Sequence, residues 1–239
     1  MRIAIDTHTH TLVSGHAYNT MKEMAKAAAD KGLDGLAITE HAPMMPGTCH
    51  EYYFSNLKIV PRTMYGIELL LGVELNVLDE SGAVDLPENL IREMDLVIAS
   101  LHIPCYKGEK TEEHITNAYV RVMERGDVDI IGHPDDARFP INYQRLVETA
   151  ARTHTILEVN HTSLKPDAYR VNARENYHQM LTLCKKYGVM ISLGTDAHVD
   201  TLIGEYPYVY ELLKGEEFPE ELVANTSVEK LKSLLQHKH

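Results

Sequence analysis

Nearly continuous apolar runs recur along the chain, each long enough for one strand. They cover residues 3–6, 35–39, 69–75, 96–101, 128–132, 155–160 and 189–194. Runs of this kind, without strict polar alternation, are typical of strands that are buried on both faces of a parallel sheet. The pattern therefore predicts seven buried parallel strands.

Segments with apolar residues at helical spacing separate these runs. The first is the best defined, because Thr20 and Glu23 form a capping-box sequence and Gly32 follows the apolar stripe. Further helices are predicted over about residues 111–125, 141–153, 170–187, 201–214 and 227–236. Strands that alternate with helices are typical of parallel βαβ units.

The alternation is regular, and no Pro-, Gly- or Ser-rich linker divides the chain. We therefore predict an α/β protein with a single domain over residues 1–239. The expected architecture is a distorted TIM-like (β/α)7 barrel with seven strands. A doubly wound open sheet is the alternative, because periodicity alone does not show whether the sheet closes.

Metal-capable side chains follow most of the predicted strands. His8 and His10 are two residues apart, so in a strand they lie on the same face. The C-terminal ends of parallel strands gather at one end of a barrel, where barrel enzymes place their chemistry. Nine such residues are expected to converge there: His8, His10, His16, His41, Glu74, His102, His133, Asp196 and His198. Imidazole and carboxylate ligands suit Zn²⁺, Mn²⁺ or Fe.

Charge and composition narrow the class of protein. The formal net charge is −12, which argues against nucleic acid or an anionic membrane as a partner. No apolar run approaches the length of a membrane span. The three cysteines are isolated in the sequence, so we expect no disulfide framework and a cytoplasmic location.

The same residues carry a family resemblance. The motifs are DTHTH at 6–10, TEH at 39–41, Glu74, SLH at 100–102, GHP at 132–134 and TDAH at 195–198. In this order they resemble the PHP (polymerase and histidinol phosphatase) domain. His-Ala-Tyr at 16–18, Pro-Arg at 61–62, GVELN at 72–76, EVN at 158–160 and Gly-Glu at 204–205 resemble the YcdX-like phosphatase branch. One difference is Glu40, which stands where the family often has Asp.

The resemblance implies a PHP-domain fold with three divalent ions, most often Zn²⁺ and sometimes Mn²⁺ or Fe. The first ion would take His8, His10, Glu74 and Asp196. Glu74 would bridge to a second ion, which His102 and His133 complete. The third ion would take His16, His41 and His198.

Phosphate monoester hydrolysis is the chemistry that this site predicts, with a small phosphorylated substrate. A hydroxide that bridges two metals would attack phosphorus in line. The residues expected to act in catalysis are Glu74, Asp196 and His198. Four further residues are candidates for substrate contact: Arg62, His50, Asn76 and Asn160. Arg62 would clamp the phosphate, and the two asparagines are also candidates to orient ligands.

Four predicted loops should form the rim of the site, at residues 42–58, 103–112, 134–140 and 162–172. They carry the tyrosines that are candidates to contact a substrate: Tyr52, Tyr53, Tyr106 and Tyr169. Loops rather than metal ligands determine substrate choice, so the sequence leaves the substrate open. A homo-oligomer is compatible with the family.

Other functions compete with this interpretation. A PHP-type phosphodiesterase or exonuclease on nucleotides or short oligonucleotides and a histidinol-phosphatase-like activity use the same ligands. An amidohydrolase also begins with HxH after its first strand, but it usually has a bridging Lys after strand four, where this chain has His102. A metal-binding module without catalysis would typically have lost ligands, and all nine positions are filled here.

Overall fold

The computed structural model describes residues 1–235, and a parallel sheet forms its centre. Seven parallel strands follow one another in the sheet: β1 (Ile5–Asp6), β2 (Gly35–His41), β4 (Ile67–Asn76), β5 (Val97–Ser100), β6 (Ile130–Ile131), β7 (Ile156–Asn160) and β8 (Ile191–Gly194). All seven predicted strands are confirmed. An eighth, β3 (Thr63–Met64), pairs antiparallel with β4 alone and was not predicted, because two residues make no apolar run.

The first and last parallel strands meet just beyond their C-terminal ends. Thr9 and Ala197 form a parallel bridge there. The His10 amide donates to the Ala197 carbonyl at 2.9 Å, and the Asp196 amide donates to the His8 carbonyl at 2.9 Å. The sheet is therefore nearly closed, so the predicted distorted (β/α)7 barrel is confirmed and the open-sheet alternative is wrong.

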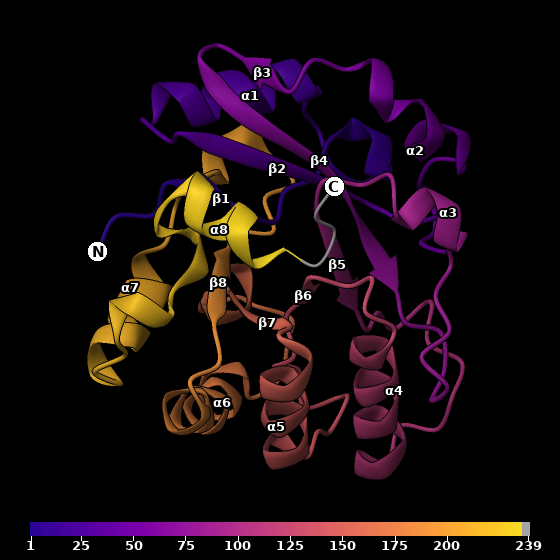
Figure 1. Ribbon diagram of the computed structural model, residues 1–239, viewed down its shortest axis with the longest axis vertical. Coiled ribbons are helices and arrows are strands. Elements are labelled where there is room, and N and C mark those ends of the chain that lie inside the picture. The colour runs from indigo at the N-terminus through magenta and orange to yellow at the C-terminus, as the bar shows by residue number, and fades with distance from the viewer. Residues whose placement is uncertain (236–239) are drawn as a thin grey trace.

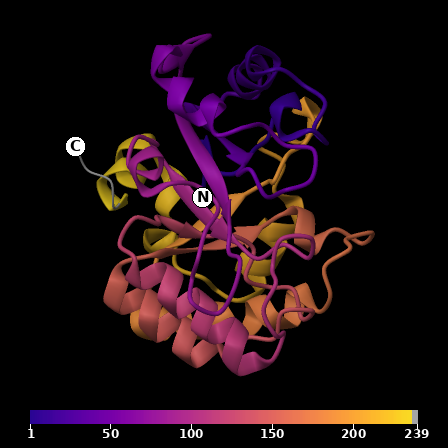
Figure 2. The same ribbon diagram turned by 90° about the vertical axis from the view of Figure 1, so that its right-hand side faces the viewer.

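Helices surround the strands, as Figure 1 shows. The longer ones are α1 (Met21–Asp30), α4 (Glu112–Glu124), α5 (Tyr143–Thr153), α6 (Ala173–Tyr187), α7 (Pro207–Gly215) and α8 (Val228–Leu234). In Figure 2, α4 and α5 lie along one side of the strands, with α1 on the opposite side. The predicted capping box is present, since the Glu23 amide donates to Thr20 Oγ1 at 3.3 Å and the Thr20 amide to Glu23 Oε2 at 2.7 Å.

Two predicted helices need correction or qualification. The helix predicted over 201–214 begins only at Pro207, because Gly204 has a left-handed φ of 67° and turns the chain. Residues 200–202 form a separate 3₁₀ turn. The last helix, predicted over 227–236, ends at Leu234, and residue 236 lies outside the described residues. The short helices α2 (Tyr52–Asn56) and α3 (Glu88–Ile91) were not predicted.

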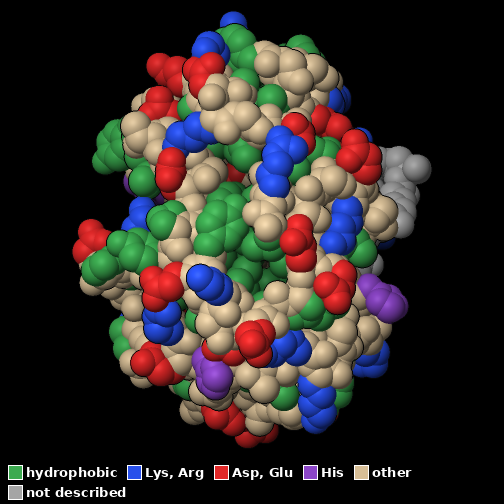
Figure 3. Space-filling model, turned by 90° about the vertical axis from the view of Figure 1, so that its left-hand side faces the viewer, with side chains coloured by type: hydrophobic (Ala, Val, Ile, Leu, Met, Phe, Trp, Pro, Cys, Tyr) green, Lys and Arg blue, Asp and Glu red, His purple; other side chains and the backbone are tan. Residues whose placement is uncertain are grey.

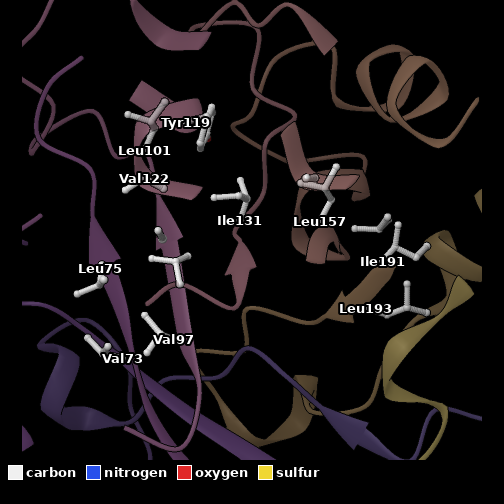
Figure 4. Packing of buried hydrophobic residues seen from close by; sticks show 14 of the residues in the cluster. Val73, Leu75, Val97, Leu101, Tyr119, Val122, Ile131, Leu157, Ile191 and Leu193 are labelled. Atoms are coloured by element: carbon white, nitrogen blue, oxygen red, sulfur yellow. The ribbon is translucent and has the colours of Figure 1, made fainter. Parts of the chain in front are cut away.

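The apolar core has two layers, one outside and one inside the barrel. The outer layer packs strand residues such as Val73, Leu75 and Leu157 against the helices (Figure 4). The inner layer joins strand residues to α8 and consists of Ile5, Ala37, Leu70, Leu96, Ile98, Ile130, Ile156, Ala224, Val228, Leu231 and Leu235. Because α8 packs against early strand positions, it closes the N-terminal end of the barrel and leaves the C-terminal end for the polar residues.

Close strand packing requires glycine at one position of β4. A Cβ built on Gly72 would lie 2.1 Å from the carbonyl oxygen of Leu96, which is rigid backbone. We expect Gly72→Ala to lower the free energy of unfolding by about 2 kcal/mol, because the strands must separate to admit the methyl group. Urea denaturation at constant metal concentration measures this change.

Gly215→Ala is the matched control, since a Cβ there meets no atom within 4 Å. Gly215 is the last residue of α7, so alanine should leave stability unchanged or raise it by up to about 0.5 kcal/mol. Equal stability of the Gly72→Ala variant and the wild type would contradict the close contact.

Candidate metal centre

A single buried carboxylate, that of Glu74, lies at the centre of the polar cluster. Glu74 is near the end of β4 and is fully buried. Its Oε1 is 2.9 Å from His133 Nε2 and 3.2 Å from His102 Nε2. Its Oε2 is near three more imidazole nitrogens: His41 Nδ1 at 2.6 Å, His8 Nε2 at 3.4 Å and His10 Nε2 at 3.5 Å. The carboxylate therefore reaches both sides of the cluster.

Four donor atoms from three strand ends form the first predicted ligand group. His8 Nε2 is 3.1 Å from His10 Nε2, and both nitrogens face Asp196 Oδ1, at 3.7 and 3.3 Å. With the distances to Glu74 Oε2 already given, five of the six separations in the group run from 3.1 to 3.7 Å. Ligands about 2.1 Å from a tetrahedral zinc ion lie roughly 3.4 Å from one another. His8, His10 and Glu74 have the spacing that such an ion requires, whereas Asp196 belongs to none of the donor groups within residues 1–235 whose atoms all lie within 4.8 Å of one another.

Two buried atoms in the cluster are not satisfied by hydrogen bonds. His41 Nδ1 and Glu74 Oε2 are 2.6 Å apart, yet neither has a hydrogen-bond partner among the described residues. An unsatisfied buried polar atom is costly, and the usual explanation is an ion or a water. The donor set and these two atoms together fit divalent metal ions.

The third predicted ligand group is looser. The His16 ring centroid is 4.7 Å from that of His198 and 5.0 Å from that of His41. Within residues 1–235, the groups whose donor atoms all lie within 4.8 Å are His10–His41–His198, His8–His10–Glu74 and His41–Glu74–His102. His16 is exposed and lies outside these groups, although its ring borders the cluster.

Hydrogen bonds on the far side of the imidazoles fix their orientation. His8 Nδ1 donates to Glu158 Oε1 at 2.7 Å, and His102 Nδ1 donates to Asn76 Oδ1 at 2.7 Å. Each bond turns the other ring nitrogen toward Glu74. Contacts of this kind are typical of histidines that bind metals.

Glu40 orients a further imidazole indirectly. The Ser14 hydroxyl donates to Glu40 Oε2 at 2.6 Å and lies 3.3 Å from His10 Nδ1. The His41 amide also donates to Ser14 Oγ at 3.1 Å. Glu40 therefore holds the loop that carries Ser14, as expected for a residue that is not itself a ligand.

Two of the predicted ligands have a strained backbone. His133 has a φ of 31° and Asp196 a φ of 55°. Both values lie in the left-handed region, which residues other than glycine rarely adopt. The neighbouring Gly194 is required for space, because a Cβ there would lie 2.0 Å from Glu158 Oε1. Strain of this kind is concentrated at functional sites.

The buried carboxylates and imidazoles of the cluster shift one another's pKa values. Burial by itself would raise the pKa of Glu74, but His102, His8 and His41 outweigh it and hold that pKa well below its usual range. Burial is the main cause that lowers the pKa of His10 well below its usual value, and the nearby His41 and His198 lower that pKa further. Burial would lower the pKa of His8 too, but Glu158, Glu74 and Asp196 outweigh it and raise that pKa well above its usual value, so a metal ion that binds His8 must displace a proton.

Two buried residues at the site had not been assigned a role from the sequence. Glu158, from β7, binds His8 and also accepts from the His133 amide at 2.7 Å. Arg170 donates to Asp196 Oδ2 at 3.0 Å and to Ser163 Oγ at 2.9 Å. The EVN motif contained Glu158, but no sequence signal marked Arg170, which lies in a loop.

The asparagines proposed for substrate contact lie behind the ligands. Asn76 is fully buried and receives the His102 hydrogen bond. Asn160 is also fully buried, and its amide group donates to Glu158 Oε2 at 3.2 Å and to Asp196 Oδ2 at 3.4 Å. Of their two expected roles, the structure favours orienting ligands over contacting substrate.

The structure places Arg62 and His50, two of the candidate substrate contacts, away from the cluster. The Arg62 guanidinium binds Asp95 and the carbonyls of Leu57 and Val60, near the start of β4 and far from its ligand-bearing end. His50 is exposed, accepts from the Tyr52 amide at 3.2 Å, and is not among the residues that line the cavity. Neither side chain borders the cluster.

A cavity of about 520 Å³ opens onto the cluster. Six predicted ligands border it, and all four predicted rim loops contribute side chains. Of the four candidate tyrosines only Tyr169 lines it, with the guanidinium carbons of Arg138 and Arg170 at 5.3 and 5.1 Å from its ring centroid. The cavity therefore has two cations beside the carboxylate–imidazole cluster.

Comparisons with known proteins agree with this geometry. The family model described as the PHP domain matches residues 6–165. A "Probable phosphatase" of Clostridium novyi is 43% identical over 238 residues, covering 100% of this chain and 96% of that protein. A "Probable phosphatase" of Acetivibrio thermocellus is 41% identical, covering 100% of this chain and 97% of that protein. The chain belongs to the PHP domain family.

A solved structure has the same fold. The histidinol phosphate phosphatase of Lactococcus lactis, in complex with zinc, L-histidinol and phosphate, superimposes with a TM-score of 0.60. The two sequences are 18% identical, and the match covers 92% of this chain and 95% of that one. At this level of identity the comparison supports the barrel architecture.

One face of the molecule carries charged side chains of both signs. In Figure 3, Lys and Arg side chains are interspersed with Asp and Glu. Among residues 1–235, no helix combines the length and the apolar character needed to cross a bilayer.

Removal of metal should destabilise the fold. Glu74, Glu158 and Asp196 are buried together, and bound cations would offset their repulsion. We expect chelation to lower the melting temperature by roughly 5–10 °C, and Zn²⁺ or Mn²⁺ to restore it. Differential scanning calorimetry with elemental analysis measures both. An unchanged melting temperature, with no metal in the purified protein, would contradict the fit of the cluster to metal ions.

Proposed function

We propose that the protein is a metal-dependent phosphatase that hydrolyses phosphate monoesters of small molecules. The observation that carries the proposal is the convergence of the donor atoms on Glu74 at the base of a cavity bordered by Arg138 and Arg170. The two curated relatives named as phosphatases support the same class of reaction.

Three divalent ions are proposed, with zinc the first choice and manganese or iron as substitutes. His8, His10, Glu74 and Asp196 would hold the first. Glu74, His102 and His133 would hold the second, and His16, His41 and His198 the third. Because His10 is also close to His41 and His198, it lies at the junction of the first and third sites.

Divalent ions held by these residues would activate water as a nucleophile near neutral pH and would neutralise charge on the phosphoryl oxygens. The side chains provide the frame for this chemistry. Glu74 and Asp196 set the spacing between ligand groups, and His198 is held by its Nδ1 donating to the Asp196 carbonyl at 2.9 Å. Arg170 fixes Asp196 Oδ2, so that Oδ1 faces the imidazoles.

The two arginines are suited to bind the phosphate of the substrate. Arg138 binds the Asp136 carboxylate through Nε and Nη2, which leaves Nη1 as an available donor. Arg170 is buried and borders the same cavity. Charge-assisted hydrogen bonds from guanidinium to phosphate are strong and directional. We assign this role to Arg138 and Arg170 in place of Arg62.

The cavity volume favours a small phosphorylated substrate over a polymer. The three cysteines are free thiols, which is compatible with a cytoplasmic enzyme.

Loss of a proposed ligand should abolish activity. We expect Asp196→Ala and His133→Ala to lower the metal content of the protein, because each substitution removes a donor atom. The turnover of 4-nitrophenyl phosphate should fall by roughly a hundredfold or more. His178→Ala is the control, since His178 is exposed on α6 and pairs with Glu216. Retained activity in the Asp196 variant would disprove the assigned site.

Loss of a phosphate contact should weaken substrate binding. Arg138→Gln removes a cation at the cavity, so we expect KM to rise about tenfold while metal content stays constant. Arg152→Gln is the matched control, because Arg152 is exposed on α5 and binds Glu124. Steady-state kinetics distinguish the two variants, and an unchanged KM for Arg138→Gln would remove it from the phosphate site.

A further inference from the structure

The wall of the cavity away from the metal centre is mostly apolar. Beyond the six predicted ligands, ten residues line the cavity, and six of them are apolar or aromatic: Met45, Leu101, Ile103, Pro104, Phe139 and Tyr169. Ile103 and Tyr169 are 43% and 61% exposed, so their side chains present accessible surface. Ile103 directly follows His102, which places it beside the centre.

The four polar residues that line the cavity are already engaged. The Asp136 carboxylate accepts from Arg138 and from the Val171 amide. The Thr162 hydroxyl donates to the Thr195 carbonyl at 2.8 Å. The two arginines, Arg138 and Arg170, are the proposed phosphate contacts. Beyond Arg138 Nη1 and the Tyr169 hydroxyl, few hydrogen-bonding groups of these residues are therefore left for the alcohol portion of a substrate.

We infer that this phosphatase selects phosphate monoesters whose alcohol portion is apolar or aromatic, and that Ile103 is a specificity-determining residue. The inference rests on the proposed function. A hydroxyl group that leaves water without gaining a hydrogen bond costs free energy, whereas an apolar group gains from burial against Ile103 and Leu101. Esters of polyhydroxylated sugars would bind this wall poorly.

Two substrates of similar intrinsic reactivity test the inference. 2-Phenylethyl phosphate and glucose 6-phosphate are both esters of primary alcohols, so the acidity of the leaving group differs little between them. We expect the metal-loaded wild type to have at least a tenfold higher kcat/KM for 2-phenylethyl phosphate. An equal or higher kcat/KM for glucose 6-phosphate would overturn the inference.

A pair of isoleucine variants assigns the preference to the cavity wall. We expect Ile103→Asn to reduce the preference for 2-phenylethyl phosphate at least threefold, mainly through KM, because it replaces apolar surface with an amide. Ile59→Asn is the matched control, since Ile59 is 70% exposed and does not line the cavity. A preference that is equal in both variants would remove Ile103 as the determinant.

The failure of this inference differs from the failure of the proposed function. The wild type could hydrolyse 4-nitrophenyl phosphate and yet prefer glucose 6-phosphate to 2-phenylethyl phosphate. That result would leave the phosphatase assignment intact and overturn the proposed specificity. No turnover of 4-nitrophenyl phosphate, 2-phenylethyl phosphate or glucose 6-phosphate by the metal-loaded protein would overturn the proposed function itself, and the inference with it.

Discussion

The burial of the Glu74 carboxylate among imidazoles is the constraint on which the rest of the structure depends. A carboxylate without water needs charge or hydrogen bonds on both oxygens, and Glu74 finds nitrogen atoms on both sides. These nitrogens come from strands that are far apart in the sequence. Only a nearly closed barrel brings the ends of β1, β2, β5 and β6 around one point on β4.

The two ends of the barrel have opposite properties, and this division creates the site. At one end α8 covers an apolar interior that includes Ile98 and Leu70. Two residues beyond Ile98 along β5 lies Ser100, and two further lies His102. The inward positions therefore change from apolar to small to metal-capable along β5 and the two residues that follow it. Glycines at 132 and 194 leave room for Ser100 and Glu158 in between.

Much of the fold and the ligand group was predictable, because both depend on patterns of local sequence. Buried strands appear as apolar runs, and a histidine after such a run lies at the C-terminal end of a barrel. The start of α7 was predicted too early, because helical spacing does not register the turn at Gly204. The two-residue β3 and the short helices depend on tertiary packing, which no local pattern records.

The contacts around the ligands were less predictable, because they depend on loop conformation. Arg62 was chosen for its motif, yet its guanidinium binds Asp95 and nearby carbonyls. Arg170 lies in the loop after β7, and only the folded chain shows that it binds Asp196. Glu158 is recognisable in hindsight, since an acidic residue inside a buried apolar run requires a partner, and His8 is that partner.

The most direct test of the central claim is anomalous X-ray diffraction at the zinc edge from crystals grown with Zn²⁺. We expect anomalous peaks within bonding distance of both Glu74 oxygens, one beside His8, His10 and Asp196 and another beside His102 and His133. Zinc bound elsewhere, with Glu74 contacting only protein atoms, would show that the carboxylate–imidazole cluster is not a metal centre.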